Sequence, residues 1–562
     1  MRGGPWNIKW QVCRPEFNLT IGVETTMRKD SVDTTSSTDS TPSPISTDGM
    51  DDTSSEQSSA RHGALRTPPS GSSTMLGSPV ISGDQEESEL IDLSPLQCGP
   101  TLLHERITAP LFTRGAYVDM GGSVTFPSRG LLGTVLSSSR HGYFILVLVV
   151  TRTESVIICS VKEPESPSQI EDPRIYNAPF SAVICGVQGS GKSHTVSVLL
   201  ENMLIPKHPQ IGSLYKPLSG LVLHYGEGGP SSLPSEAAWL GVPDDPNVEA
   251  PQIRVFVSKS SLSTMKAVYQ TLDSDRVVVE PLLFSESELD AQAFLTMMSV
   301  QSKESAPLYV QLILSILRDL GENFTYQAFI QELEIKKRKL QPQQLTALKQ
   351  RMDLLNSFLD KKRSTRRWAT LGGRFSPGCL TIVDLSDPFI DAASACNIFE
   401  IITRQFVRAD TTTGKVLLVD EAHKYLHTTN VSGGLTKELT TLIRQQRHLA
   451  MRVIISTQEP NVLPPVLLDL CGVTILHRFS SPSWWDHLSR HAAVDTSNGE
   501  AYDKILELQT GQAIVISPAA LVTAGYAWNE NRGVTTLGRK WLLIKTRKRI
   551  TRDGGRSVMV VE

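Results

Sequence analysis

Short apolar runs alternate with polar segments through most of the chain, from residue 180 to residue 516. They recur at residues 180–185, 220–224, 253–257, 379–385, 416–419, 452–456, 473–477 and 513–516. Each run is long enough for a buried strand of a parallel sheet and too short for a helix. Helical patterns separate several of these runs, which predicts an α/β fold built on a mainly parallel sheet.

A helical period replaces the strand pattern in the middle of the chain. Ser285 with Glu288 three residues later forms a capping box, and this motif predicts the start of a helix. The helical segments expected here are residues 284–298, 308–320 and 345–359. The region therefore predicts a helical insertion in the α/β core, and it carries basic clusters at residues 336–339 and 361–367.

The two ends of the chain have different textures from the core. The N-terminal region is dominated by Ser, Thr, Asp and Pro and has almost no aromatic residues, which predicts disorder. Short apolar runs over residues 100–172, among them 116–120 and 143–150, predict a small β-rich unit. The run at 143–150 is too short to cross a bilayer, so no membrane span is expected. The segment after residue 520 is basic.

These patterns divide the chain into six regions. They are a disordered region 1–99, a β-rich domain 100–172, the first part of the α/β core 173–282, a helical insertion 283–370, the second part of the core 371–520, and a basic C-terminal extension 521–562.

The amino-acid composition excludes few classes of protein. The 562 residues carry a formal net charge of −3, so any surface that binds nucleic acid has to be local. Seven cysteines without a C-x-x-C pair read as reduced thiols of an intracellular protein, and the nuclear and cytoplasmic alternatives stay open.

The strongest chemical signal follows the run at 180–185. Residues 186–193 fit G-x-x-x-x-G-K-[ST], the Walker A pattern, between a predicted strand and a predicted helix. Glycines let successive backbone N–H groups point at phosphate oxygens, and a helix that starts there adds its positive dipole end. The residues expected to bind ATP are Gly186, Val187, Gln188, Gly189, Ser190, Gly191, Lys192, Ser193 and His194. Lys192 would face the β and γ phosphates, and the Ser193 hydroxyl would bind Mg²⁺.

A second motif supplies the acids that such a site needs. The strand at 416–419 ends in Asp420 and Glu421, the form of a Walker B. Asp420 would hold Mg²⁺, partly through water, and Glu421 would polarise the attacking water.

Three further side chains are candidates for catalysis. Gln458 follows the strand at 452–456, and its amide would lie near the γ-phosphate and the water. Arg444 and Arg447 are arginine-finger candidates that would act on the nucleotide of a neighbouring subunit. A surface salt bridge or a nucleic-acid contact is at least an equal alternative for each arginine.

The order of these motifs resembles that of the HerA/FtsK superfamily of ring-forming DNA-pumping ATPases, most of all its HerA branch. The matching stretches are GVQGSGKSHT at 186–195, TIVDLS at 381–386, VLLVDEAHKYL at 416–426, IRQQRHLAMRVIISTQEP at 443–460 and GQAIVIS at 511–517. The resemblance implies a RecA-like ATPase core with a helical insertion, a homo-hexameric ring and translocation of DNA through a central pore. It also implies an N-terminal β-barrel, of which residues 100–172 would be a shortened form.

The DEAH-box helicases are a competitor, because residues 420–423 spell DEAH. The spacing decides against that class, since Lys192 and Asp420 lie 228 residues apart and no second-domain arginine motif follows. The quartet is therefore interpreted as a Walker B followed by Ala-His and nothing more.

The sequence leaves three functions open. The first is an ATPase, stimulated by DNA, that translocates or unwinds DNA with the help of its basic clusters. The second is a motor of the same fold that acts on protein, and the third is a nucleotide-binding switch or scaffold with slow hydrolysis.

Overall fold

A computed structural model gives the fold of this chain. It describes residues 109–122, 128–138, 155–160, 179–209, 211–214, 216–298, 308–360, 371–426, 433–495, 499–524 and 533–554. The predicted disordered region, the apolar run at 143–150 and the basic cluster at 361–367 lie outside these residues. In the part of the chain that is described, no helix is both long and apolar enough to cross a membrane.

The core is the parallel half of a large sheet, in the order β13, β4, β12, β11, β7, β10, β8, β9. These strands are β13 (Val473–Leu476), β4 (Ser181–Cys185), β12 (Met451–Thr457), β11 (Lys415–Val419), β7 (Ser219–His224), β10 (Cys379–Asp384), β8 (Gln252–Val257) and β9 (Val277–Pro281). All neighbours among them pair in parallel. Because β12 lies between β4 and β11, the strands that carry the two Walker motifs are not adjacent, and the end of β12 lies between them.

The other half of the sheet is mostly antiparallel and continues from β13 in the order β14, β17, β2, β3, β1, β15, β16. These strands are β14 (Gln512–Ile516), β17 (Trp541–Thr546), β2 (Ser128–Ser138), β3 (Ser155–Ser160), β1 (Phe112–Thr113), β15 (Leu521–Ala524) and β16 (Gly533–Thr536). The strands β2, β3 and β1 from the N-terminal region lie between strands from the C-terminal region, since β17 pairs with β2, and β1 pairs with both β3 and β15. The β-rich region and the C-terminal extension are thereby joined to the parallel core through one sheet.

Helices cover both faces of the parallel half, because alternate strand residues enter two different apolar cores. In β4, Val183 belongs to the core that includes α13 (Ala392–Arg408) and α14 (Gly434–Arg444). Its neighbour Ile184 belongs to the core that includes α6 (Lys192–Leu204) and α7 (Leu262–Gln270). This arrangement confirms the predicted α/β class with a RecA-like, mainly parallel core.

Shorter elements complete the described residues. They are the helices α15 (Pro465–Leu470), α16 (Pro482–His491) and α17 (Glu500–Glu507), the 3₁₀ turns η2 (Glu236–Gly241), η6 (Ala422–Lys424) and η8 (Pro460–Val462), and the strand pair β5 (Lys207–His208) and β6 (Gly212–Ser213).

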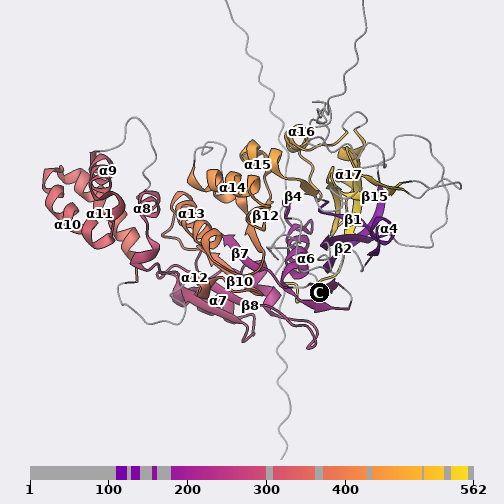
Figure 1. The fold of residues 1–562 in the computed structure, drawn as a ribbon, viewed down its shortest axis with the longest axis horizontal. Coiled ribbons are helices and arrows are strands. Elements are labelled where there is room, and N and C mark those ends of the chain that lie inside the picture. The colour runs from indigo at the N-terminus through magenta and orange to yellow at the C-terminus, as the bar shows by residue number, and fades with distance from the viewer. Residues whose placement is uncertain are drawn as a thin grey trace, which may run out of the picture. The chain divides into compact units, whose positions relative to one another are not determined.

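The helical insertion is present between β9 and β10, at the left of Figure 1. It comprises α8 (Ala291–Met297), α9 (Leu308–Leu320), α10 (Tyr326–Lys336), α11 (Pro342–Ser357) and α12 (Leu371–Arg374), with the 3₁₀ turns η3 (Glu286–Glu288), η4 (Gly321–Asn323) and η5 (Lys337–Lys339). Phe294 and Phe329, whose ring centroids are 4.2 Å apart, are fully buried between its helices.

The start of the insertion differs from the prediction. The capping box of Ser285 and Glu288 forms, but it closes only the 3₁₀ turn η3. The helix α8 begins later, where the side chain of Asp290 accepts from the N–H of Ala293. Glu288 also makes a buried ion pair of 2.7 Å with Arg374 of α12, so the motif joins the two ends of the insertion as well as capping a turn.

The strand expected at residues 116–120 is also wrong, because α4 (Arg114–Asp119) occupies this position. Thr113 caps that helix by accepting from the N–H of Ala116 at 3.5 Å. Ala116 and Tyr117 are buried in a small apolar cluster with Leu521. The apolar residues of this run therefore lie on one face of a short helix. The run alone does not distinguish such a helix from a strand.

Candidate nucleotide site

Residues 186–191 join β4 to α6 at the carboxyl edge of the sheet. Gly191 has a φ of +103°, a left-handed conformation that glycine adopts without strain, and it stands at the N-cap of α6 with no side-chain hydrogen bond. A Cβ on Gly186 would lie 2.6 Å from the Cβ of His477, so only glycine fits there. The helix thus begins without a side-chain cap, and its first N–H groups are suited to bind an anion.

Lys192 lies beside the second Walker motif. Its Nζ donates to Oε1 of Glu421 at 2.8 Å and to Oγ of Ser456 at 3.3 Å. Lys192 is 4% exposed, so its ammonium is held in a site largely closed to water. The fold therefore brings the two Walker motifs into direct contact, as their sequence patterns require.

Glu421 is placed by an unusual backbone conformation. Its φ is +48° and its ψ is +42°, in the left-handed region, which costs a residue with a side chain about 1 to 2 kcal/mol. Such strain concentrates at functional sites. Here it turns the chain sharply between β11 and η6, and the carboxylate reaches Lys192.

Gln458 also contacts this carboxylate. Its Nε2 donates to Oε2 of Glu421 at 2.8 Å, so Lys192 and Gln458 each bind one oxygen of the same group. Gln458 follows β12, the strand between the two Walker strands, and this position explains how it reaches the site. The sequence placed its amide beside the attacking water, whereas the structure gives it a direct partner in Glu421.

His224 was not predicted as part of the site. It ends β7, and its Nδ1 lies 3.2 Å from Oδ2 of Asp420. Burial disfavours a charge on His224, but the hydrogen bond to Asp420 and the nearby charge of Asp384 outweigh it, so the pKa of His224 is raised. Burial would likewise raise the pKa of Asp420, but the contact with His224 lowers it to about 2. Asp420 is therefore ionised at neutral pH.

The residues present fit Mg²⁺. An ionised carboxylate at Asp420 and a hydroxyl at Ser193 are hard oxygen donors, and Mg²⁺ is commonly held by one or two carboxylates together with substrate phosphates and water. Among the described residues, no group of three or more His, Cys, Asp or Glu side chains could hold a metal by itself. This donor set suits an ion that arrives with a nucleotide.

His423 is a second residue that sequence reasoning missed. Its Nε2 lies 3.5 Å from Oε2 of Glu421, and its Nδ1 lies 3.4 Å from the backbone nitrogen of Gln458. The fourth residue of the DEAH quartet is thus in contact with the catalytic candidates, which corrects its interpretation as nothing more than a neighbour of the Walker B.

Arg444 and Arg447 are not brought to this site. Both precede β12 and are exposed, whereas Gln458 follows the same strand. The seven residues of β12 separate the two edges of the sheet by about 20 Å. Neither arginine therefore reaches the nucleotide site of its own chain.

Most of the remaining Walker A residues lie in the loop between β4 and α6, whereas His194 lies on α6. Gln188 and Gly189 are exposed, and Ser190 is buried, with its hydroxyl donating to the carbonyl of Val187. His194 turns toward the C-terminal extension, where its Nε2 lies 2.8 Å from the carbonyl oxygen of Arg547. The sequence predicts that His194 binds ATP, but it does not indicate this contact with Arg547.

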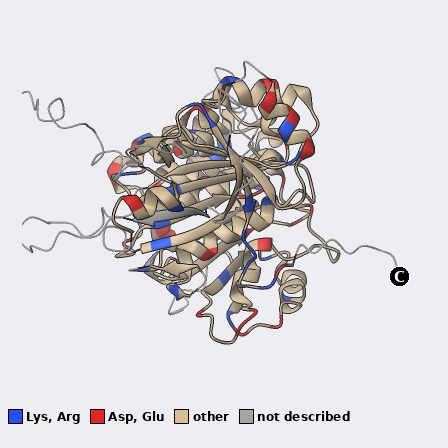
Figure 2. Ribbon diagram, turned by 90° about the vertical axis from the view of Figure 1, so that its right-hand side faces the viewer, with Lys and Arg blue, Asp and Glu red and all other residues tan. Residues whose placement is uncertain are grey.

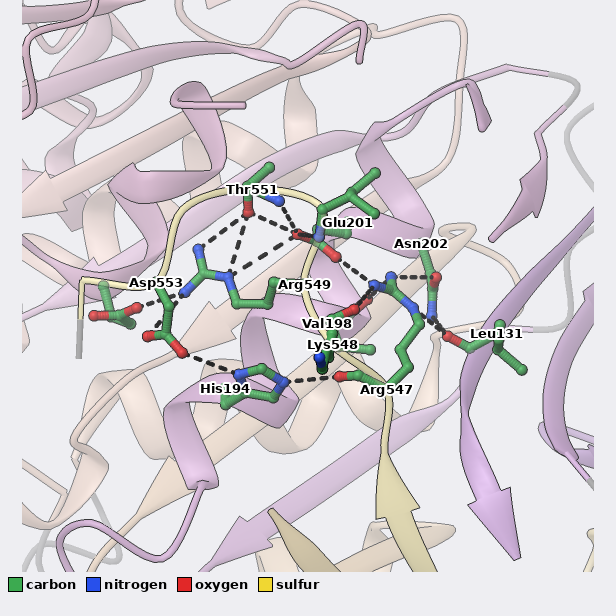
Figure 3. A network of polar contacts seen from close by, with 12 residues as sticks. Leu131, His194, Val198, Glu201, Asn202, Arg547, Lys548, Arg549, Thr551 and Asp553 are labelled. Atoms are coloured by element: carbon green, nitrogen blue, oxygen red, sulfur yellow. Dashed lines mark hydrogen bonds and ion pairs between the residues drawn. The ribbon is translucent and has the colours of Figure 1, made fainter. Parts of the chain in front are cut away.

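The C-terminal strap, defined here as residues 545–553, runs along α6 (Figure 3). Glu201 of α6 is completely buried, and its carboxylate accepts from Nη1 of Arg547 at 2.6 Å and from the N–H and Oγ1 of Thr551 at 3.0 and 2.6 Å. Arg547 also donates to Asn202 of α6 and to the carbonyl of Leu131 in β2. Segments from both ends of the chain therefore hold the helix that carries Lys192.

This geometry defines the class of protein. A glycine loop that opens a helix, a lysine at its start and a paired Asp-Glu at the end of a nearby parallel strand make up the site of a P-loop NTPase with a RecA-like fold.

Comparison with known proteins does not identify this protein beyond that class. No family profile and no curated protein matches the chain. Solved structures do match, among them the genome packaging NTPase B204 of Sulfolobus turreted icosahedral virus 2, in complex with AMP. That match has 11% identity and a TM-score of 0.25, and covers 60% of this chain and 92% of B204.

Two further solved structures give similar values. The bacterial conjugative coupling protein TrwBdeltaN70 matches at 12% identity and a TM-score of 0.34, over 66% of this chain and 87% of its own. VirB4 of Thermoanaerobacter pseudethanolicus has the same identity and TM-score, over 66% of this chain and 90% of its own. At TM-scores this low the likeness carries no weight for the family or the function of this chain.

Proposed function

We propose that this protein is an ATP-hydrolysing motor that moves DNA. The observation that carries the enzymatic part is the contact of Lys192 and Gln458 with opposite oxygens of Glu421. A lysine that faces phosphates and an acid that activates water must lie within a few ångströms of each other around a γ-phosphate. The slow-switch alternative does not call for this arrangement.

Each residue has a distinct task in the proposed reaction. The N–H groups of the Walker A loop bind the phosphate oxygens, and Lys192 neutralises charge on the β and γ phosphates. Ser193 and Asp420 would hold Mg²⁺, which supplies further neutralisation of phosphate charge when it is bound. Glu421 accepts the proton of the water that attacks the γ-phosphate.

DNA is the proposed cargo because the order of the motifs resembles that of DNA-pumping ATPases, and because exposed cations lie in the C-terminal segment. These are Arg539, Lys540, Lys545, Lys548 and Arg552. The cluster at 336–339 supports the proposal less than its sequence does, since Lys336 pairs with Asp319 and Lys337 pairs with Glu334. Acidic and basic residues are interspersed over the side of the molecule drawn in Figure 2. The DNA would therefore be bound by a few local contacts with its phosphates.

The test measures ATP turnover and nucleotide affinity with and without double-stranded DNA. Lys192→Ala should lose ATP binding, because it removes the cation that faces the phosphates. Glu421→Gln should retain binding and lose turnover by at least about 100-fold, because it removes only the base. Stimulation of the wild type by DNA should weaken steeply as salt rises, since phosphate contacts release counterions.

Two results would count against the proposal. Equal loss of ATP affinity in both variants would contradict the separate roles of Lys192 and Glu421. Turnover that is unchanged by DNA at low salt would leave an ATPase but remove DNA as its cargo, in favour of a motor that acts on protein.

A further inference from the structure

His423 lies on η6, two residues after Glu421, and its side chain is 14% exposed. Both of its ring nitrogens face groups of the nucleotide site. Nδ1 lies 3.4 Å from the backbone nitrogen of Gln458, and Nε2 lies 3.5 Å from Oε2 of Glu421.

These contacts determine which nitrogen carries the proton. A backbone N–H only donates, so Nδ1 of His423 accepts from Gln458 and carries no hydrogen itself. In the neutral ring the proton is therefore on Nε2, which points toward the carboxylate of Glu421. Burial lowers the pKa of His423 despite the nearby charges of Glu421 and Glu459, which favours the neutral ring at physiological pH.

The two oxygens of Glu421 have different surroundings. Among the described residues, Oε1 accepts from Nζ of Lys192 at 2.8 Å, whereas Oε2 accepts from Nε2 of Gln458 at 2.8 Å and has Nε2 of His423 3.5 Å away. A carboxylate held through one oxygen keeps a fixed orientation and leaves its other oxygen directed at the phosphate-binding lysine. Oε1 is then the oxygen that accepts the proton of the attacking water.

We infer that His423 is a positioning residue that, together with Gln458, holds Oε2 of Glu421 and so directs Oε1 toward the reacting phosphate. The catalytic meaning of this role rests on the proposed ATPase function, whereas the contact itself does not. It also gives Gln458 a different task from the one that its sequence indicates, because its amide orients the base and not the water.

Two substitutions at position 423 separate this role from a merely structural one. Glutamine places its amide nitrogen near the position of the histidine Nε2, so His423→Gln keeps a donor toward Glu421. Asparagine is shorter and places its polar atoms near the position of Nδ1, so His423→Asn keeps the partner of Gln458 and loses that donor. His491→Asn is the matched control, because His491 of α16 makes a partly exposed contact with Asp469 of α15 that lies outside the nucleotide site.

The two His423 variants are expected to differ in turnover and not in ATP binding. His423→Asn should lower kcat by about 10- to 100-fold, the scale of a misplaced catalytic group, with ATP affinity and thermal stability close to those of the wild type. His423→Gln should retain kcat within about threefold, and His491→Asn should equal the wild type. Wild-type kcat in both His423 variants, or an equal loss of affinity and stability in both, would overturn the inference.

A crystal structure of each variant tests the same point without any activity. The Glu421 carboxylate should stay in place in His423→Gln and turn away in His423→Asn. An unmoved carboxylate in both variants would refute the positioning role even if turnover fell. If the wild type hydrolyses no ATP while the carboxylate moves as expected, the proposed ATPase fails and the positioning role stands.

Discussion

At the scale of single residues, His477 is the most unusual buried group under the phosphate loop. It follows β13, is completely buried, and donates from Nδ1 to the carbonyl of Gln512 at 3.0 Å. Burial lowers its pKa from the ordinary value of 6.5 to about 4. Its ring packs against Gly186 and Gly191, so a charge there would lie beside Lys192 in a site that excludes water.

A lowered histidine pKa has a defined consequence for stability. The folded chain keeps His477 neutral down to a pH of about 4, whereas the unfolded chain protonates it near pH 6.5. Its contribution is therefore complete above pH 6.5 and is lost progressively as the pH falls toward 4. The slope added to the free energy of unfolding approaches, but does not exceed, about 1.4 kcal/mol per pH unit.

His477→Gln should remove this slope, because glutamine does not titrate. Urea unfolding of the wild type and the variant between pH 7 and pH 4.5 measures the difference, and other titrating groups cancel in the comparison. Ser489→Ala on α16 removes no titrating group, so it provides the control and should keep the wild-type slope. Parallel curves for the wild type and His477→Gln would show that His477 ionises in the folded state as it does in the unfolded chain.

At the scale of elements, α6 and the C-terminal strap behave as one unit. The carboxylate of Glu201 has four donors in the strap, from Arg547, Ile550 and Thr551. Arg547 itself is only half-buried as a residue, but its guanidinium lies within this network. Lys192 and Ser193 begin the same helix. By stabilising α6, the strap therefore also helps to hold these two residues of the nucleotide site in place.

Glu201→Gln should lower the free energy of unfolding by about 3 kcal/mol, since it leaves Arg547 without its buried counterion. The double variant Glu201→Gln with Arg547→Met should recover part of this loss. Chemical denaturation measures both, and Glu507→Gln, which breaks the exposed pair with Lys504, should change stability by less than about 1 kcal/mol. A small effect of Glu201→Gln would mean that the strap holds α6 through its backbone contacts alone.

At the scale of the whole molecule, the proposed catalytic set is divided between two edges of the sheet. Glu421 and Gln458 lie at the carboxyl edge, whereas Arg444 and Arg447 are exposed at the opposite edge of β12. In the proposed ring, either arginine would therefore have to reach the nucleotide site of a neighbouring subunit. The finger would then act only between subunits.

Mixing experiments test this arrangement. Arg444→Ala or Arg447→Ala subunits and Glu421→Gln subunits should each be nearly inactive alone. A one-to-one mixture should recover up to about a quarter of wild-type turnover, because that fraction of sites combines an intact Glu421 with a neighbour's intact arginine. Arg490→Ala, an exposed arginine on α16, should remain fully active without mixing. Absence of recovery for both arginines would exclude them as fingers in trans.

The sequence by itself determined the chemistry and the order of the core strands along the chain. The Walker A loop, Asp420 and Glu421 are local signals, because each depends on a few adjacent residues with a fixed relation to one strand or helix. The apolar runs of the parallel strands are equally local, since strands covered on both faces must be apolar at every position. These parts of the fold and of the site could be predicted without any partner being known.

Only the tertiary structure decided which side chains meet. The sheet order places β12 and β7 next to the Walker B strand, and this is how Gln458 reaches Glu421 and His224 reaches Asp420. His423 belongs to the site because a sharp turn at Glu421 brings its ring back to the carboxylate. Arg547 looks in the sequence like part of a basic surface, but pairing of β17 with β2 and β14 turns its guanidinium onto Glu201. The partner of a side chain depends on strand register and strand order. Contacts between distant segments determine both, so the local sequence pattern does not predict the partner.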